Sequence, residues 1–481
     1  MHSSKSHSAD APLYLQLADR LQNLIKAGTF KPGDRIPSVR HLSAQHHVSI
    51  PTVLQAYVTL EDRRLIEARP KSGYFVRADL DAPLRPSARS RRQLQPKSLA
   101  QFPPLMSLVH DVANPNLVPM GGANPSADLL PGTKLARITA AIARSHTKQS
   151  ISYDPVPGCP ALREQLSRRS LDWGCALSPD DFIITNGATE ALHLALSVTT
   201  QPGDTVLIES PTYYGVLTIL SHLKLRAIGV PTCPQRGLDL NAAKKILSRD
   251  RVAAIVVMPN FNNPLGSLMP DSNRSDLLAL AAQHQIPIIE DDIYGDLQHH
   301  GERPATLKSL DKNHQVLLCG SFSKTLAPGY RVGYLSASRY QDKIIQLKTA
   351  QNFCSAPLPA LTIAEFLKNG GYDHHLRTLR NAFHHQVTQM RETLLAQLPS
   401  DTHISEPTGG FVLWVELPKK VDTLALFHQA REAGISIAPG HLFSPAAEFK
   451  HHLRISCGHP WNPAMEKAVA QLTRMIHHQL R

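Results

Sequence analysis

Lys324 and three side chains near it in the sequence have the types needed to bind a phosphorylated carbonyl compound. The segment GSFSKTLAPGYRVGY, residues 320–334, places Ser321 and Ser323 beside the lysine and Arg331 seven residues after it. The lysine amine can condense with a carbonyl group, and the hydroxyls and the guanidinium can hold a phosphate. For Lys324 taken alone, an ordinary lysine in a surface loop is the simpler alternative.

Four further segments place polar or aromatic side chains directly after short apolar runs. The runs are residues 181–185, 205–209, 253–258 and 286–290, and they are followed by NGATEAL with Gly187, Ala188 and Thr189, ESPTYYG with Tyr213, PNFNNPLG with Asn263, and EDDIYGD with Asp291 and Tyr294. A helix that begins after Gly187 would direct free N–H groups at an anion, and Tyr213 could stack on a flat ring. A buried Asp291 would need a partner such as a protonated pyridine nitrogen. Each segment alone has an ordinary structural explanation, but together they favour one ligand site.

The apolar runs have the length and composition of β-strands that are buried on both faces. Together with residues 316–320, which precede Lys324, they alternate with helical patterns, and this alternation predicts an α/β fold with a parallel sheet. Ligands bind such sheets at the carboxyl ends of the strands. A long helical pattern over residues 372–398 precedes apolar segments at 409–417, 435–439 and 452–456, which predict a smaller C-terminal α+β subdomain.

Basic residues are concentrated near the N-terminus. Residues 1–100 hold 16 of the 51 Lys and Arg residues but only 8 of the 39 Asp and Glu residues. This asymmetry indicates a module that binds a polyanion, with an ordinary basic surface as the alternative. We expect three zones: a compact module over residues 12–78, an exposed basic linker with five prolines over residues 79–104, and a large domain over residues 105–481, with its smaller subdomain at about residues 355–481 plus the N-terminal segment.

The first zone carries the pattern of a helix-turn-helix followed by a β-hairpin. Ser38 and Ser49 are placed to cap two short helices, and the second of these helices is expected to carry an apolar face of Leu54, Tyr57 and Val58. The segment LIEARPKSGYFV, residues 65–76, predicts a two-stranded wing with Gly73 at its bend.

The residue types in this module suit DNA. Arg35 and Arg40 flank the first short helix, where they could neutralise phosphates. Ser49, Thr52 and Gln55 lie at the start of the second, where side chains reach base edges in the major groove.

From PLYLQLADRLQNLIKAGTFKPGDRIPSVRHLS through HVSIPTV to LIEARPKSGYFV, the chain resembles the GntR-type winged helix over about 65 residues. The resemblance implies binding of double-stranded promoter DNA, and the contacts it implies are Arg35, Ser38, Arg40, Ser49, Thr52 and Gly73. One position departs from the pattern, because the family often carries arginine directly after the serine at Ser49 and this chain has Ile50. The operator sequence therefore cannot be transferred from the family.

Across residues 110–481, the order of segments is similar to that of fold-type I pyridoxal 5'-phosphate (PLP) enzymes of the class I/II aminotransferase group. The resemblance implies a Schiff base between PLP and Lys324. It implies these further contacts with PLP: Asp291 with the pyridine nitrogen, Asn263 and Tyr294 with the ring hydroxyl, Tyr213 stacked on the ring, and Gly187, Ala188, Thr189, Ser321, Ser323 and Arg331 at the phosphate, which Tyr153 of the neighbouring subunit also reaches. Arg454, in HLRIS, would bind the carboxylate of a substrate or effector. Asp291 is preferred to Asp292 because of its three-residue spacing to Tyr294.

A winged helix, a Pro-rich basic linker and an aminotransferase-like domain together resemble the MocR subgroup of GntR-type transcription regulators. The resemblance implies a cytoplasmic homodimer in which an amino acid or amine forms an external aldimine with PLP and so alters promoter binding. Two alternatives stay open: a functional aminotransferase (transaminase) with a DNA-binding appendage, and a sensor of PLP itself.

Other patterns predict neither a metal site nor a membrane segment. No apolar run approaches the roughly 18 residues of a membrane span, and the first residues lack the apolar core of a signal peptide. The six cysteines include no CxxC pair, which fits a reducing cytoplasm. Four histidine doublets are interpreted as solvated helix faces: His374 and His375, His384 and His385, His451 and His452, and His477 and His478.

Overall fold

The computed structural model describes residues 12–30, 33–46, 48–63, 65–69, 73–76, 95–97, 103–369, 371–446 and 448–481. The chain divides into two compact units, residues 1–85 and 86–481. Most of the predicted linker lies outside the described residues. Among its described residues, Lys97 exchanges backbone hydrogen bonds of 3.0 and 3.1 Å with Ala227, and Pro103 and Pro104 begin helix α4 (Pro103–Asp111).

The first unit is a winged helix, as the sequence predicts. Its elements are α1 (Leu13–Lys26), α2 (Val39–His46), α3 (Ile50–Asp62), and the antiparallel strands β1 (Ile66–Arg69) and β2 (Gly73–Val76). The expected apolar face of α3 is partly wrong. Tyr57 is fully buried and donates a hydrogen bond to the Pro37 carbonyl oxygen at 2.5 Å, but Leu54 and Val58 are exposed, because Val53 and Leu60 face the core in their place.

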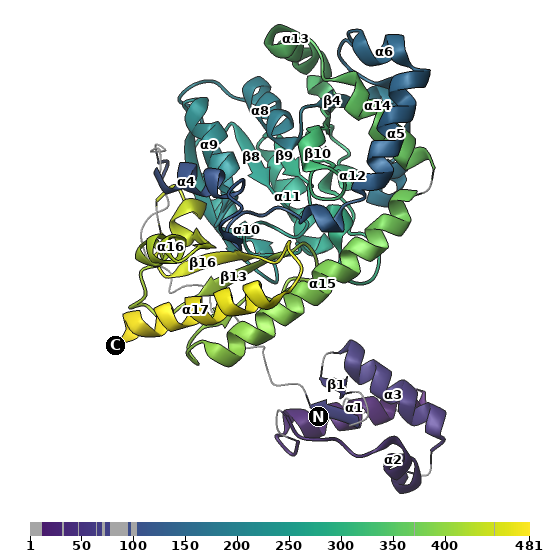
Figure 1. Cartoon of the computed structure of the whole chain (residues 1–481), viewed down its shortest axis with the longest axis vertical. Coiled ribbons are helices and arrows are strands. Elements are labelled where there is room, and N and C mark those ends of the chain that lie inside the picture. The colour runs from purple at the N-terminus through teal and green to yellow at the C-terminus, as the bar shows by residue number, and fades with distance from the viewer. Residues whose placement is uncertain are drawn as a thin grey trace, which may run out of the picture. The chain divides into compact units, whose positions relative to one another are not determined.

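The second unit is built on an eight-stranded sheet (Figure 1). Its strands in spatial order are β4 (Ile183–Thr185), β11 (Gly333–Ser336), β10 (Val316–Ser321), β9 (Ile288–Asp291), β8 (Ala254–Val257), β5 (Thr205–Ser210), β6 (Arg226–Cys233) and β7 (Gly237–Leu238). The sequence predicts a parallel sheet, and two strands depart from that direction. Strand β11 lies antiparallel between β4 and β10, and β7 is antiparallel to β6, so the sheet is mixed. The other strands, β4 included, run in one direction.

Helices cover both faces of this sheet, so its strands are almost wholly apolar. The helices of the large domain are α5 (Gly132–Ser145), α6 (Thr147–Ile151), α7 (Pro160–Ser170), α8 (Ala188–Thr199), α9 (Tyr214–His222), α10 (Leu240–Leu247), α11 (Asp271–Gln283), α12 (Leu307–Leu310), α13 (Gln341–Asn352) and α14 (Pro357–Lys368). One buried cluster joins α8, α9 and α13 to the sheet, and another joins α10 and α11 to it. Such burial on both faces is typical of α/β sheets.

The smaller subdomain follows the long helix α15 (Gly371–Gln397), which lies beside α17 (Pro463–Leu480) in Figure 1. Its antiparallel sheet has the order β12 (His403–Ile404), β13 (Val412–Glu416), β16 (His452–Ser456) and β15 (Ala438–Pro439), and α16 (Thr423–Glu432) packs beside it. A separate pair, β3 (Val118–Pro119) and β14 (Ile435–Ser436), ties the segment after α4 to this subdomain. Within the described ranges, no helix has the length and apolar character needed to cross a membrane.

Candidate functional site

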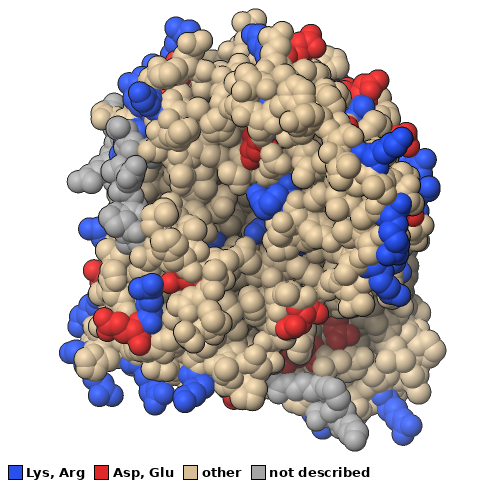
Figure 2. Space-filling model, turned by 45° about the horizontal axis from the view of Figure 1, so that its top comes forward, with Lys and Arg blue, Asp and Glu red and all other residues tan. Residues whose placement is uncertain are grey.

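Five strands that share one direction end at the same edge of the large sheet, and each is followed by residues that the sequence singles out. Gly187 follows β4, Tyr213 follows β5, Asn263 follows β8, Asp291 ends β9 and Lys324 follows β10. Figure 2 shows one face of the molecule hollowed near its centre, with Lys or Arg side chains inside the hollow. This edge is where α/β sheets bind ligands.

The amine of Lys324 is held by the segment just before α5. Its Nζ donates hydrogen bonds to the carbonyl oxygen of Ala123 at 2.7 Å and to Oδ1 of Asn124 at 3.2 Å. Burial, together with the positive charges of Arg454 and Arg331, lowers the pKa of Lys324 to about 8. A lysine with a lowered pKa is partly neutral near pH 7 and can attack a carbonyl. Sequence reasoning missed both partners, because the Asn-Pro pair at Asn124 indicates a turn but not a contact 200 residues away.

The two consecutive aspartates at the end of β9 have different surroundings. Asp292 accepts hydrogen bonds from Arg303 and, at 2.7 Å, from Nδ2 of Asn260. Asp291 is also buried, but within the described part of the chain its Oδ1 has no hydrogen-bond partner. Burial and the charge of Asp292 raise the pKa of Asp291 to about 7. A buried carboxylate oxygen without a partner fits a ligand that brings a positively charged N–H group.

A hydrogen-bonded chain links the large sheet to the small one across the site. Nδ2 of Asn263 donates to the Tyr294 hydroxyl at 3.5 Å, and Arg454, in the middle of β16, donates from NH1 to Oδ1 of Asn263 at 3.2 Å. The NH2 group of Arg454 donates to the Gly121 carbonyl oxygen. Arg454 is fully buried, and among the described residues its Nε has no acceptor. The guanidinium therefore has donor capacity to offer a carboxylate.

The groups predicted to hold a phosphate meet at the N-terminus of α8. The hydroxyls of Ser321 and Ser323 are 2.8 Å apart, and NH1 of Arg331 donates to the Ser323 hydroxyl at 3.2 Å. Arg331 also donates from NH2 to the Asn186 carbonyl oxygen at 3.1 Å. Gly187 has a φ of +83°, and a Cβ there would lie 2.4 Å from NH2 of Arg331, so only glycine allows this approach. Free N–H groups at the start of α8, two hydroxyls and a guanidinium form an anion site.

The two predicted tyrosines lie in different places. The ring of Tyr213 packs 4.7 Å from that of Tyr214 and over Gly215, where a Cβ would come within 2.3 Å of it. Burial raises the pKa of Tyr213, so the side chain is a neutral, flat surface beside the site. Tyr153 is instead 79% exposed, and its ring packs 5.2 Å from that of Phe353. Tyr153 therefore lies on the surface of its own chain.

In the winged helix, the predicted DNA-contacting side chains lie at the surface or close to it. Ser49 accepts a hydrogen bond from the Thr52 backbone N–H at 3.3 Å and caps α3, while Ser38 accepts one from the His41 backbone N–H at 3.3 Å. Arg35, Ser38, Arg40 and Ser49 are exposed, and Thr52 is half-buried. Gly73 has a φ of +103° and packs against the Arg35 guanidinium, which therefore lies along the base of the wing. The bend of the wing, residues 70–72, lies outside the described residues.

The interpretation of the histidine doublets as solvated helix faces is partly wrong. Nε2 of His375 lies 2.6 Å from the Thr325 carbonyl oxygen, the ring of His384 lies 4.4 Å from that of His300, and His452 is buried in a strand. Each is one member of a doublet on an element whose inner side faces the core. Among the residues that the structure describes, no three His, Cys, Asp or Glu side chains are grouped to hold a metal ion.

Two known families match this chain. Residues 13–76 match the bacterial regulatory proteins of the gntR family, and residues 124–472 match aminotransferase class I and II. Among curated proteins, the HTH-type transcriptional regulator YjiR of Escherichia coli is 35% identical over 96% of this chain and 98% of its own length. The HTH-type transcriptional regulator YdcR of the same organism is also 35% identical, over 97% of this chain and 99% of its own length.

Solved structures resemble the second unit. The α-aminoadipate aminotransferase LysN of Thermus thermophilus, complexed with N-(5'-phosphopyridoxyl)-L-leucine, has a TM-score of 0.74 and 27% identity, covering 79% of this chain and 96% of its own. The kynurenine aminotransferase of Pyrococcus horikoshii, in complex with PMP, has the same TM-score at 25% identity and the same coverage. These similarities confirm the predicted aminotransferase fold of type I.

Proposed function

Since this chain belongs to the MocR subgroup of GntR-type transcription regulators, in which a GntR domain precedes an aminotransferase class I and II domain, we propose that it binds PLP at the described site. Its affinity for promoter DNA would then change when an amino acid or amine binds at the same site. The observation that carries the proposal is the convergence of Lys324 and Asp291 with the anion site at one sheet edge. We take residues 12–78 as the DNA-binding domain, 79–104 as the linker and 105–481 as the ligand-binding domain.

The residues present fit PLP. Lys324 would attach the cofactor covalently, Asp291 would pair with its pyridine nitrogen, and Asn263 and Tyr294 would bind the ring hydroxyl. Tyr213 would stack on the ring, and the phosphate-binding set would be Gly187, Ala188, Thr189, Ser321, Ser323 and Arg331. Bound PLP supplies an aldehyde carbon that exchanges amines and a ring that withdraws electrons.

An amino acid is the effector that this site favours. Arg454 is buried beside Asn263, and its planar guanidinium can bind a carboxylate through two hydrogen bonds. The carbonyl oxygen of Ala123 and Oδ1 of Asn124 would hold the Lys324 amine whenever it is not attached to the cofactor. A ligand that makes these contacts in one conformation of the protein and not in another shifts the equilibrium toward the first conformation.

We also propose a cytoplasmic homodimer. Tyr153 and Phe353 form an exposed aromatic pair on the second unit, which a second copy could cover. The resemblance to class I/II aminotransferases implies that Tyr153 would then reach the partner's phosphate site. A dimer with two-fold symmetry places two winged helices on DNA, so the operator would contain paired half-sites.

The proposal is tested by adding PLP to the purified protein and recording the visible spectrum and the binding of its own upstream DNA at physiological salt. We expect a visible band and specific DNA binding that changes when an amine is added. The absence of the band, or affinity no better than for random DNA, would refute the proposal. Sustained keto-acid formation from amino acids would instead indicate a working aminotransferase.

The pKa of Lys324 predicts how PLP attachment depends on pH. Only the neutral amine reacts, so the rate of attachment to cofactor-free protein should rise about tenfold per pH unit below pH 8 and become nearly constant above it. Stopped-flow absorbance measures this rate. Free Nα-acetyl-lysine, with an unperturbed pKa of about 10.4, is the control, and the rate of its reaction with PLP should keep rising up to pH 10. A protein rate that still rises between pH 9 and 10 would contradict the lowered pKa.

Arg40 is expected to contact a DNA phosphate. Arg40→Ala should weaken binding about equally for all duplexes and reduce the slope of log affinity against log salt by about 1. Fluorescence anisotropy at several salt concentrations measures the slope. Arg339→Ala, which removes an exposed cation from the second unit, should leave it unchanged. Equal effects of the two substitutions would mean that Arg40 acts only through net charge.

A further inference from the structure

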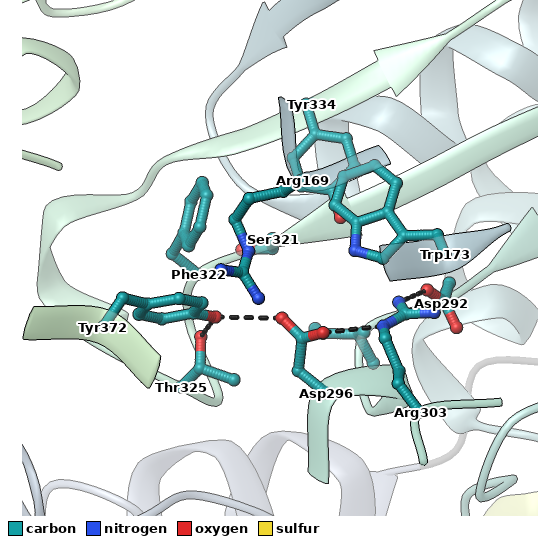
Figure 3. A pocket seen from close by; sticks show the side chains of 11 residues that line it. Arg169, Trp173, Asp292, Asp296, Arg303, Ser321, Phe322, Thr325, Tyr334 and Tyr372 are labelled. Atoms are coloured by element: carbon teal, nitrogen blue, oxygen red, sulfur yellow. Dashed lines mark hydrogen bonds and ion pairs between the residues drawn. The ribbon is translucent and has the colours of Figure 1, made fainter. Parts of the chain in front are cut away.

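A buried ion-pair network lies directly behind Asp291. Arg303 pairs through NH2 with Asp292 and through Nε with Asp296 at 2.6 Å. The three side chains are 6%, 1% and 14% exposed, and the Arg303 guanidinium lies 5.4 Å from the centre of the Trp173 ring. Figure 3 shows Arg303 between the two carboxylates, with the indole of Trp173 on one side. These charges are therefore largely shielded from water and depend on one another.

The same network reaches the residue that follows Lys324. The Tyr372 hydroxyl lies 3.0 Å from Oδ2 of Asp296 and 3.0 Å from Oγ1 of Thr325 (Figure 3). Arg303 is thus connected to the sequence neighbours of two residues that would contact the cofactor: Asp292, which follows Asp291, and Thr325, which follows Lys324.

The network supports the site and does not itself offer room for a ligand. The cavity among these side chains measures about 10 Å³, roughly the space of one water molecule. A Cβ on Gly295 would lie 2.4 Å from Oδ1 of Asp292 and 2.6 Å from NH2 of Arg303, so the backbone packs directly on the ion pair. Arg303 therefore acts on the site only through its partners.

We propose that Arg303 is the positioning residue that keeps Asp291 available as an anion for the pyridine nitrogen, by neutralising and holding Asp292. This inference rests on the proposed PLP site. The side chains of consecutive residues at a strand end point to opposite faces. Asp292 pairs with Arg303, whereas Oδ1 of Asp291 has no hydrogen-bond partner among the described residues, and the charge of Lys324 acts on Asp291. An unneutralised charge on Asp292 would oppose the charge on Asp291, because like charges in a buried site disfavour each other's ionisation. Arg303 offsets part of this repulsion by pairing with Asp292 and leaves Asp291 as the carboxylate without a hydrogen-bond partner on its Oδ1 among the described residues.

The test compares the PLP affinity of Arg303→Gln, Asp292→Asn and the double variant with that of the wild type by absorbance titration. We expect Arg303→Gln to raise the Kd for PLP by about 10- to 100-fold, the range that follows from losing a charge-assisted pairing. The pH at which affinity is half-maximal should also rise by about one unit. The double variant, which lacks the unpaired negative charge, should bind PLP within about 3-fold of the wild type.

Arg163→Gln is the matched control, because Arg163 is 13% exposed, pairs with Asp180 at 3.0 Å and contacts none of the predicted cofactor residues in the hydrogen bonds described. It should change the thermal midpoint but not the Kd. Arg303→Lys keeps the charge and provides a variant that folds if Arg303→Gln does not, and its Kd should lie within about 10-fold of the wild type. An unchanged Kd in Arg303→Gln, or a double variant no better than the single one, would overturn the proposal. A wild type that binds no PLP would refute the proposed function itself.

Discussion

Lys324→Ala is expected to abolish the visible band that PLP acquires on binding the protein and to remove the ligand response of DNA binding. Among the described side chains at the sheet edge, the amine of Lys324 is the one group that can attach the cofactor covalently. It donates hydrogen bonds to Ala123 and Asn124, and its pKa is lowered to about 8. Without it, PLP is held only by noncovalent contacts, and an amine has no lysine to displace. The visible spectrum and DNA anisotropy, measured with and without amine, check this.

Lys308→Ala is the matched control for this prediction. Lys308 also has a pKa lowered by burial, but its Nζ donates to the Val316 carbonyl oxygen at 2.9 Å, at the opposite end of β10 from Lys324. This variant should keep the visible band and the ligand response. A Lys324→Ala protein that still switches normally would contradict the assignment.

Arg454→Met is expected to weaken the binding of carboxylate-bearing amines by about 100-fold, because a buried charged hydrogen-bonding group is removed. The probes are the standard amino acids that change the visible spectrum of the PLP-loaded wild type, each compared with its decarboxylated amine. The wild type should bind the amino acid far more tightly than the amine, and the variant should bind both about equally. PLP affinity should change much less than this, since Asn263 is the one predicted ring contact to which Arg454 donates a hydrogen bond in the described part of the chain. An unchanged preference for the amino acid would place the carboxylate elsewhere.

Periodicity and strand-end motifs were sufficient to predict much of the fold and the site. The runs before Gly187, Tyr213, Asn263 and Lys324 all form strands with one direction, and directional pairing then brings distant residues to one edge. The antiparallel strand β11 was not predicted, since Gly333–Ser336 is short and its pairing depends on the turn at Arg331. Spacing to Tyr294 favoured Asp291 over Asp292, and the geometry adds a physical reason, the occupied hydrogen bonds of Asp292.

The contacts that could not be predicted are those between segments far apart in the chain. Arg303 lies in a loop whose sequence, GERPATL, has no periodicity that indicates burial. A partner cation for Asp292 could be expected on physical grounds, because two consecutive buried carboxylates are costly, but its position could not. The exposed Leu54 and Val58 of α3 show the same limit, since hydrophobicity alone does not tell which side of a short helix faces the core.

The most direct test of the central claim is a single titration of PLP-loaded protein with an amino acid that alters its visible spectrum, in which DNA affinity and absorbance are recorded together. The account predicts that both change with the same midpoint, and that Lys324→Ala removes both changes. A spectrum that shifts fully while DNA affinity stays constant would contradict it.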